Sequence, residues 1–517
     1  MTRTKPPPVR LCALVIGSAA TIGIVLRLSA TASGTAPLVP RPTAPSPSVI
    51  QHHNGPSRDG VYVESSLTPL ALAGLHLDPA FHPAIRGPVY AQPLYLDDVA
   101  SGHGTLYVAT EQNLVYAIDA VTGAVRWQTP LGVPAGRGRL PCGNIDPLGV
   151  TGTPIIDVTS RTVFVDAMTA PEGSTTTKHM VFGLSVDDGS VRTGWPVDVA
   201  AALSSAGMAF DSAVQNQRGA LAILGHTLFV PYGGHFGDCG DYRGWVVGFP
   251  LDRPVAVRAF ATRAHGGGMW APGGISSDGA SLFVATGNTM GATTWSGGEA
   301  VIRLAPDLRF TGTPADFFAP LDWKALDNGD VDLGGTGAIQ IDVPGATPRH
   351  LVVAMGKNGK IYLLDRANLG GIGNGLFNQH IASGPIIDAP AAYTTDRGTF
   401  LVFKGAGIGC AGGTDLTAVR ITPSPLAFGV AWCAHANSRG SPMVTTTDGH
   451  AGFVVWTAGA DGDGRLRAFD GDTGHVLYAG GAATDGMNGI ARFQTPIVAH
   501  GKIYVAGENR LYAFAVK

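Results

Sequence analysis

Apolar and polar residues alternate along most of this chain in short runs that tight turns separate. Residues 106–131 show the pattern most clearly: two alternating apolar runs flank a short polar turn, and a second turn at Thr122-Gly123 leads into a third run that carries Trp127. Such alternation predicts β-strands that bury one face. A unit of this kind cannot bury its apolar face alone, so it has to stack on similar units.

Weaker copies of this unit recur to the end of the chain, where residues 502–514 repeat the same pattern. We count eight copies, of which the first begins near Val89. The eighth begins at Phe493 and ends after its third strand, so we expect its missing outer strand from residues 75–85 near the N-terminus. Residues 51–517 are therefore predicted to form an all-β fold: an eight-bladed β-propeller of four-stranded blades, closed by an N-terminal strand that completes the last blade.

The composition agrees with many short strands joined by tight turns. Glycine accounts for 73 of 517 residues, without a collagen-like period, and charged residues make up only 14% of the chain. The formal net charge of −3 provides no basic surface, which argues against a nucleic-acid partner. A closed ring can use this length as one domain, and we expect a monomer.

The first residues have the layout of a secretory signal peptide. Arg3, Lys5 and Arg10 form a positive region, residues 11–26 form an apolar core, and residues 30–32 offer a small-residue cleavage site. We assign residues 1–32 to a signal peptide; the alternative is an uncleaved membrane anchor, although the apolar run is short for a bilayer span of about 20 residues. Residues 33–50 are predicted to be a Pro-rich, disordered linker. We expect a secreted, periplasmic or cell-envelope protein that meets a membrane only through an uncleaved N-terminal segment.

Four cysteines remain after the predicted signal peptide. An even number of cysteines in an exported protein favours disulfides. Cys410 and Cys433 are the closer pair in sequence, which leaves Cys142 to pair with Cys239. Metal ligation is the alternative, but none of the four has the C-x-x-C spacing of a zinc or redox site.

The repeat at residues 115–131, VYAIDAVTGAVRWQTPL, resembles the repeat of quinoprotein-type propellers. This family includes dehydrogenases that use pyrroloquinoline quinone (PQQ) and the outer-membrane assembly-factor propellers. Residues 54–60 are also similar to the opening turn of the dehydrogenases. The resemblance covers nearly all of residues 51–517 and implies the propeller fold. It is much less specific for activity, because non-catalytic members share the repeat.

Two residues of the fourth repeat resemble part of the dehydrogenases' cofactor site. The spacing between Trp270 and Asn288 is similar to that between the family's cofactor-stacking tryptophan and its calcium-ligating asparagine. An indole can lie flat against a planar quinone, and an amide oxygen is a suitable ligand for Ca²⁺. The alternative assigns Trp270 to blade packing and Asn288 to a turn.

An acidic pair and a lysine follow at positions that also resemble the family. Asp330 and Asp332 lie in a segment similar to the one that holds the catalytic aspartate base, although Val331 stands between them where the family has a tryptophan. A carboxylate there could take a proton from an alcohol as hydride leaves; a solvated acidic turn or a structural calcium loop is the alternative that we favour. Lys357 falls where the family places a cation against the quinone oxygens, and an exposed hairpin-turn lysine is its alternative.

Two weaker candidates complete the set that the resemblance implies. Glu172 lies in the loop that holds the family's calcium-ligating glutamate, and His265, just before the glycines that lead to Trp270, could approach the cofactor. One feature departs from the family: the dehydrogenases stack the quinone on a disulfide between adjacent cysteines, and this chain has no Cys-Cys pair.

A Gly-rich loop at residues 232–242 lies outside the family pattern. His235 together with Asp238 and Asp241 could ligate a metal. We favour the alternative, in which Cys239 pins the loop and its polar groups serve the turns.

Two functions are compatible with these observations. The first is an exported binding or scaffold propeller whose central funnel takes a small molecule or a protein partner, with no cofactor assured. The second is a dehydrogenase of alcohols or sugars that depends on PQQ and Ca²⁺. The missing Cys-Cys pair favours the first.

Overall fold

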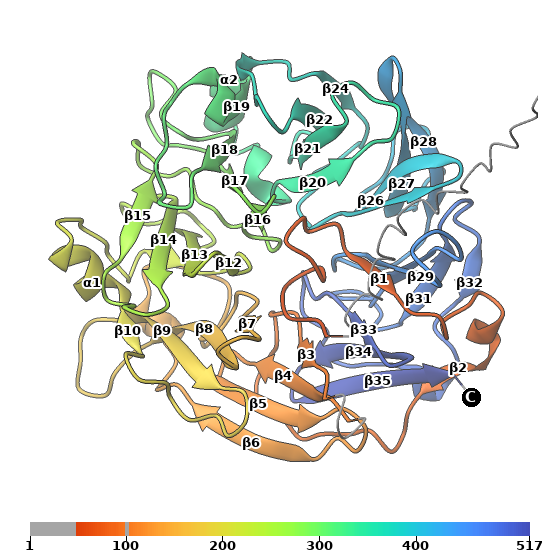
Figure 1. Ribbon diagram of the computed structural model, residues 1–517, viewed down its shortest axis with the longest axis horizontal. Coiled ribbons are helices and arrows are strands. Elements are labelled where there is room, and N and C mark those ends of the chain that lie inside the picture. The colour runs from red at the N-terminus through yellow and green to blue at the C-terminus, as the bar shows by residue number, and fades with distance from the viewer. Residues whose placement is uncertain (1–47, 99–102, 517) are drawn as a thin grey trace, which may run out of the picture. The chain divides into compact units, whose positions relative to one another are not determined.

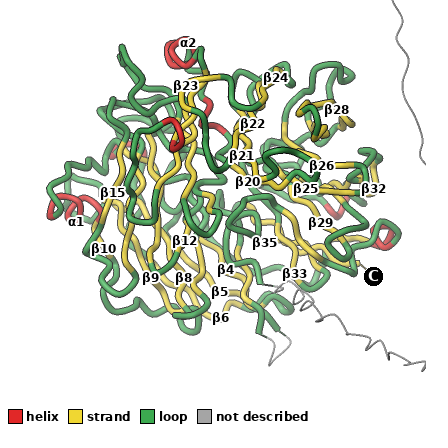
Figure 2. The backbone as a smooth tube through the Cα atoms, turned by 45° about the horizontal axis from the view of Figure 1, so that its top comes forward, coloured by secondary structure: helices red, strands yellow, loops and turns green. Residues whose placement is uncertain are grey.

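Eight sheets surround one axis in the computed structural model of this chain, which describes residues 48–98 and 103–516 (Figure 1). The eight-bladed, four-stranded β-propeller that the alternating pattern predicts is confirmed. Two α-helices occur in the described ranges, α1 (Val199–Ser205) and α2 (Trp323–Asn328), and both lie at the periphery (Figure 2). Neither is long and apolar enough to cross a bilayer. The predicted signal peptide lies outside the described residues.

Each blade contains four strands in antiparallel order from the axis outward. Blade 1 consists of β3 (Leu94–Leu96), β4 (Thr105–Ala109), β5 (Leu114–Asp119) and β6 (Val125–Pro130), and blade 2 of β7 (Ile155–Asp157), β8 (Thr162–Thr169), β9 (Lys178–Ser185) and β10 (Val197–Asp198). Blade 3 consists of β12 (Ala222–Leu224), β13 (Thr227–Gly234), β14 (Trp245–Pro250) and β15 (Arg258–Ala261), and blade 4 of β16 (Ser276–Ser277), β17 (Leu282–Thr286), β18 (Ala300–Leu304) and β19 (Phe317–Pro320). The short strand β11 (Gln215–Asn216) extends blade 3.

The remaining blades follow the same order. Blade 5 consists of β20 (Ile339–Asp342), β21 (His350–Met355), β22 (Lys360–Asp365) and β24 (Phe377–His380), and blade 6 of β25 (Ala391–Thr395), β26 (Gly398–Lys404), β27 (Leu416–Pro423) and β28 (Leu426–Ala434). Blade 7 consists of β29 (Met443–Thr446), β30 (Val454–Thr457), β31 (Arg467–Asp470) and β32 (Val476–Tyr478), and blade 8 of β33 (Ile497–Ala499), β34 (Lys502–Gly507), β35 (Arg510–Val516) and β2 (Leu75–Leu77). The strand β23 (Gly371–Gly373) adds to the outer edge of blade 4 in parallel.

The eighth blade is a composite of the two ends of the described chain. β2 supplies its outer strand and pairs antiparallel with β35, with Leu77 opposite Phe514. The outer strand predicted from residues 75–85 is therefore confirmed. Because the first and last strands share one sheet, the ring is closed by backbone hydrogen bonds and no long edge remains open.

The alternating pattern arises because each blade is packed on both faces. In β4, Leu106 and Val108 belong to the core between blades 1 and 8, whereas Tyr107 and Ala109 belong to the core between blades 1 and 2. The central strands are thus buried throughout, while the outer strand β6 is largely exposed. Successive side chains of a central strand therefore point alternately toward the two adjacent blades, and not alternately toward a core and toward solvent.

Residues 49–64, which we call the entry segment, run around the inside of the ring. The segment bonds to all eight blades, through Tyr95, Ile156, Leu221, Ser277, Gln340, Ala392, Val444 and Gly501. Val49 and Ile50, which the sequence analysis placed in the linker, already belong to this arrangement. The strand β1 (Val61–Val63) completes the circuit by pairing in parallel with β29.

Arg58 anchors the entry segment at the centre of the ring. Its side chain is only 1% exposed. Nε donates to Ile275 O at 2.9 Å, Nη1 to His52 O at 2.8 Å, and Nη2 to Leu221 O at 2.8 Å. A buried guanidinium is stable in this place because backbone carbonyls satisfy its donors.

Two disulfides join neighbouring segments of the ring. Cys142 pairs with Cys239 and Cys410 pairs with Cys433, with Cα–Cα distances of 6.2 and 5.9 Å. These are the pairs that the sequence spacing favours. The first links the connection between blades 1 and 2 to the loop after β13, and the second lies within blade 6. Two disulfides are typical of proteins that fold in an oxidising compartment.

Candidate functional site

A cavity of about 600 Å³, which we call the funnel, opens at the end of the channel where the inner strands begin. Its walls come from the segments that precede inner strands: Tyr90 before β3, Arg218 before β12, Trp270 before β16, Ile387 before β25 and Phe493 before β33. The entry segment bonds farther along the same strands, so it fills the channel beyond the funnel. A volume of this size is suited to a small organic molecule.

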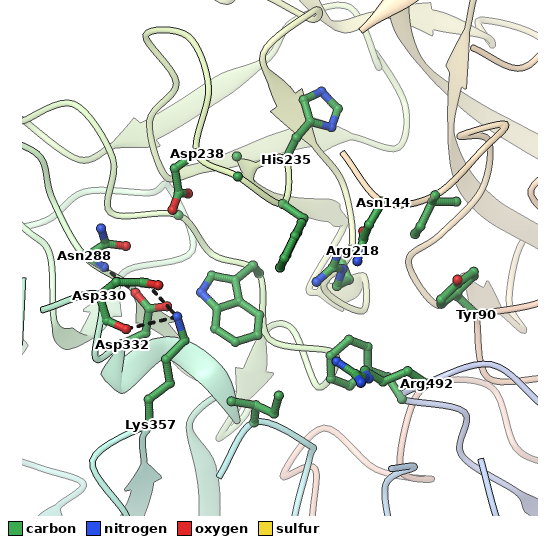
Figure 3. A pocket seen from close by; sticks show the side chains of 18 of the residues that line it. Tyr90, Asn144, Arg218, His235, Asp238, Asn288, Asp330, Asp332, Lys357 and Arg492 are labelled. Atoms are coloured by element: carbon green, nitrogen blue, oxygen red, sulfur yellow. Dashed lines mark hydrogen bonds and ion pairs between the residues drawn. The ribbon is translucent and has the colours of Figure 1, made fainter. Parts of the chain in front are cut away.

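A lysine and two carboxylates form an ion-pair cluster on one wall of the funnel (Figure 3). Lys357 Nζ lies 2.7 Å from Asp330 Oδ1 and 2.6 Å from Asp332 Oδ2. Asp332 is almost fully buried, whereas the side chain of Asp330 is 63% exposed. Asp332 also accepts a hydrogen bond from the backbone N–H of Asn288 at 2.7 Å.

The ammonium of this cluster remains charged. Burial alone lowers the pKa of Lys357, but the carboxylates of Asp332 and Asp330 outweigh it and raise the pKa above its ordinary value. Burial raises the pKa of Asp332, and the nearby ammonium opposes that change. Behind Asp332, the buried Glu299 accepts a hydrogen bond from Leu333 N at 2.6 Å, and burial followed by the charge of Asp332 raises the pKa of Glu299 to about 9. Glu299 is therefore a neutral acid at neutral pH.

The indole of Trp270 forms the wall next to the cluster. Lys357 Nζ lies 5.6 Å from the centre of its rings, within the range of a cation–π interaction. Gly287 permits this close packing, because a Cβ atom there would lie 2.5 Å from Asp332 Oδ1 and 3.1 Å from Trp270 Nε1. The sequence Gly287-Asn288 thus places the indole, the amide and the acid in one corner.

Two arginines lie across the funnel from the cluster (Figure 3). Arg492 Nη2 pairs with Asp461 Oδ2 at 2.9 Å. Arg218 has its guanidinium carbon over the ring of Phe493, 5.5 Å from the ring centre. Carboxylates therefore neutralise Lys357 and Arg492. Arg218, in contrast, contacts an aromatic ring and forms no ion pair with the described residues.

The rim above the funnel is the loop that the sequence analysis considered for metal ligation. His235 lines the cavity and donates through Nε2 to Ala213 O at 3.0 Å, and burial lowers its pKa to about 4. Tyr242 donates to Asp238 Oδ1 at 2.6 Å, while the side chain of Asp241 is 79% exposed. The Cys142–Cys239 disulfide lies against this loop, since a Cβ atom at Gly237 would be 3.3 Å from Cys142 Sγ.

The structure brings together most of the residues that resemble the family site. Trp270, Asn288, Asp330, Asp332 and Lys357 all line the one funnel. The other two candidates lie elsewhere. His265 hydrogen-bonds Gly240 O through Nε2 at 2.6 Å, beside the rim loop and outside the cavity lining, and Glu172 lies exposed in the loop between β8 and β9.

Several residues of the funnel were not found from the sequence. Arg218 and Arg492 line the cavity and immediately precede repeats three and eight, whereas Glu111 and Glu299 are buried carboxyls near it, in the connections between the second and third strands of blades 1 and 4. One signal was available for the arginines: the inner strands of several blades begin at the funnel, so polar residues just before those repeats are placed there. The glutamates carry no such signal, because their burial depends on neighbouring blades.

The cofactors that the resemblance implies can be tested against these residues. The indole of Trp270 at the cavity wall fits a planar ring. Asn288 and Asp332 offer oxygen atoms at the cavity, but no group of three or more His, Cys, Asp or Glu side chains within residues 48–98 and 103–516 could hold a metal ion. Lys357 already neutralises the two aspartates, and neither cysteine of the nearby disulfide lines the cavity.

Comparisons with known proteins support the fold. The family model described as outer membrane protein assembly factor BamB matches residues 92–224, from blade 1 to the first strand of blade 3. Searching the curated proteins finds no match.

Solved structures of quinoprotein dehydrogenases superpose on most of the chain. The quinohemoprotein alcohol dehydrogenase from Comamonas testosteroni is 16% identical, with a TM-score of 0.60 over 92% of this chain and 81% of that one. A second one, from Pseudomonas putida HK5, is 15% identical, with a TM-score of 0.62 over 91% and 80%. A europium-containing methanol dehydrogenase is 14% identical, with a TM-score of 0.63 over 91% and 98%. The resemblance of the repeats is confirmed by the family model over residues 92–224, and the solved structures share the propeller fold.

Proposed function

We propose that this PQQ-like propeller binds a small molecule with a planar ring in its funnel, and that it does so outside the cytoplasm without catalysing dehydrogenation. The observation that carries the proposal is the corner formed by Trp270 and the Lys357 cluster at a cavity of about 600 Å³. The indole provides a stacking surface. The ammonium, held by two carboxylates, provides a fixed donor beside it.

The charge arrangement of the cluster supports binding rather than calcium-dependent chemistry. The ammonium of Lys357 lies between Asp330 and Asp332 and satisfies both carboxylates. A divalent cation would have to displace that ammonium and would gain few other donors, since Glu172 lies away from the cavity. The two disulfides support a location in an oxidising compartment. A protein partner at the funnel mouth is a further possible occupant, and the rim loop would meet it first.

A dehydrogenase of alcohols or sugars is the second candidate, and one observation favours it. Trp270, Asn288, Asp332 and Lys357 converge on a single cavity at positions that resemble the family site. There, Trp270 would stack on PQQ, Asn288 and Asp332 would offer oxygen donors to Ca²⁺, and Asp330 would be placed to hold a proton. PQQ would supply the redox chemistry.

One titration separates the two candidates. Purified protein is titrated with PQQ, with and without Ca²⁺, while tryptophan fluorescence and alcohol-dependent dye reduction are followed. We expect quenching without Ca²⁺ and no dye reduction. The quenching should be lost in Trp270→Ala and kept in the control Trp323→Ala, because Trp323 lies on α2 outside the funnel.

The opposite results are equally definite. Dye reduction that requires Ca²⁺ and disappears in Asp332→Asn would establish the dehydrogenase. If PQQ fails to bind with or without Ca²⁺, the assignment of Trp270 as a platform for planar rings is wrong.

A further inference from the structure

We infer that the wall opposite Trp270 is an anion-binding subsite in which the guanidinium of Arg218 holds a carboxylate group of the ligand. The inference rests on the proposed function, because it assigns the chemical class of the molecule that occupies the same funnel. It predicts an aromatic carboxylate, with its ring near Trp270 and its charged group at Arg218.

The side chain of Arg218 lacks the partners that a shielded guanidinium requires. Its Nε is buried and has no hydrogen-bond partner among the described residues, and the side chain forms no ion pair with any of them. Its guanidinium carbon lies over the ring of Phe493, and stacking on a ring face leaves the N–H edge of a guanidinium available. Figure 3 shows the group beside the cavity, on the side away from Lys357.

Nearby charges do not replace the missing partner. Burial lowers the pKa of Arg218, Tyr90 and Glu111 oppose this change, and Arg492 adds to it. The carboxyl of Glu111 is already used, since it accepts from Gly149 N at 2.6 Å and from Thr151 Oγ1 at 2.8 Å. Burial, partly offset by these bonds, raises the pKa of Glu111 to about 7, so near neutral pH its charge is only partial.

Two other arginines near the axis have partners for their guanidinium groups. Arg58 donates to three backbone carbonyls and to Gln51 Oε1 at 3.2 Å. Arg492 pairs with Asp461 at 2.9 Å. An unpaired buried charge is costly, and a planar oxyanion that accepts two parallel N–H bonds is the partner that matches a guanidinium.

The other cations of the funnel are neutralised by its carboxylates. Four carboxylates line the cavity: Asp238, Asp330, Asp332 and Asp461. Lys357 and Arg492 are already paired with three of them. Arg218 is thus the cation with capacity left for a carboxylate.

The test compares benzoate with benzamide, a neutral molecule of almost the same shape, by isothermal titration calorimetry. Benzoate should bind the parent protein at least about tenfold more tightly than benzamide, as expected for hydrogen bonds to a charged group. Arg218→Gln should abolish that preference and Arg218→Lys should reduce it, because lysine keeps the charge but not the fork. The matched control, Arg126→Gln, removes a guanidinium that pairs with Asp119; neither residue lines the funnel, so the substitution should leave the preference unchanged.

Thermal unfolding without ligand gives an independent measurement. If Arg218 is unpaired until an anion binds, Arg218→Gln removes an unpaired buried charge and should keep or raise the melting temperature. If Arg218 has a structural role, the same substitution should lower the melting temperature. The subsite is overturned if benzoate is not preferred by the parent, or if Arg218→Gln keeps the preference. Loss of binding in Trp270→Ala with full binding in Arg218→Gln would overturn the subsite alone, whereas unchanged binding in both variants would overturn the proposed function as well.

Discussion

The two ends of the central channel use the same residue type in opposite ways. At the filled end, Arg58 is 1% exposed and donates to carbonyls of the entry segment and of blades 3 and 4. At the open end, Arg218 has an aromatic ring beneath it and a buried Nε without a partner. Arg58 is shielded from water with its donors satisfied, whereas Arg218 lines the cavity with its buried Nε unsatisfied.

The difference separates stability from binding within one ring. A satisfied buried cation joins segments that are distant in sequence, and its removal leaves several acceptors unpaired. An unsatisfied one is a local cost that a ligand can offset, which is typical of sites where function opposes stability. Three substitutions test whether the ends differ in this way, and they are ordered from the largest expected effect.

Arg58→Met should have the largest effect, lowering the free energy of unfolding by about 3–5 kcal/mol. The substitution keeps the volume but leaves the carbonyls of Leu221, Ile275 and His52 without their donor. Chemical denaturation with circular dichroism measures the change. Arg218→Met is the matched control and should be neutral or stabilising; equal losses in the two variants would remove the distinction between the ends.

Lys357→Met should have an intermediate effect at the open end, about 1–3 kcal/mol at neutral pH, because the funnel admits water and screens the cluster. Burial already raises the pKa of Asp332, and the substitution removes the ammonium that opposes this. A carboxyl whose pKa is raised in the folded state ionises more readily in the unfolded chain, so stability should fall as pH rises through that interval. Denaturation midpoints from pH 4 to 8 check the slope, which should be smaller in Lys357→Met with Asp332→Asn than in the single variant, because other buried carboxyls such as Glu111 contribute to both. A pH-independent loss in the single variant would contradict this account.

Glu111→Gln should have the smallest effect, and it concerns binding. Tyr90, Glu111 and Arg492 are the titratable groups that act on Arg218, and the pKa of Glu111 is raised to about 7. As pH rises through 7, the Glu111 carboxylate forms and competes with a bound anion, so benzoate binding should weaken about two- to fivefold between pH 6 and 8. Calorimetry at the two pH values measures this change, which should vanish in Glu111→Gln. Persistence of the full pH dependence in that variant would assign it to another group.

The fold could be predicted from the sequence because its cause is local and repeated. Alternation in each copy fixes the strands, and the incomplete eighth copy requires a partner such as β2. Trp270, Asn288, Asp330 and Lys357 meet at the funnel because Trp270 and Asp330 precede the inner strands β16 and β20, while Asn288 and Lys357 follow the second strands β17 and β21, which run back toward the same end of the channel.

Other parts of the site depend on contacts that a linear pattern does not contain. Glu172 lies in a loop whose path is set by its own turns, so the position implied by resemblance does not place it at the cavity. His265 turns toward Gly240 because the rim loop passes beside it. Whether Arg218 has a partner depends on the hydrogen bonds that its neighbours already form. Glu111, for example, accepts hydrogen bonds from residues about 40 positions away.

The composite eighth blade also determines the order in which this protein can be completed. β2 and the entry segment emerge early during synthesis, yet the partner of β2 is the last described strand of the chain. The first residues of the propeller therefore cannot pair until the last ones have been synthesised. In an incomplete chain, β2 is unpaired and the entry segment lacks some of the eight blades to which it bonds. Biogenesis of such a ring favours release of the whole chain before folding, so shortening either end should leave the same unlatched intermediate open to proteases.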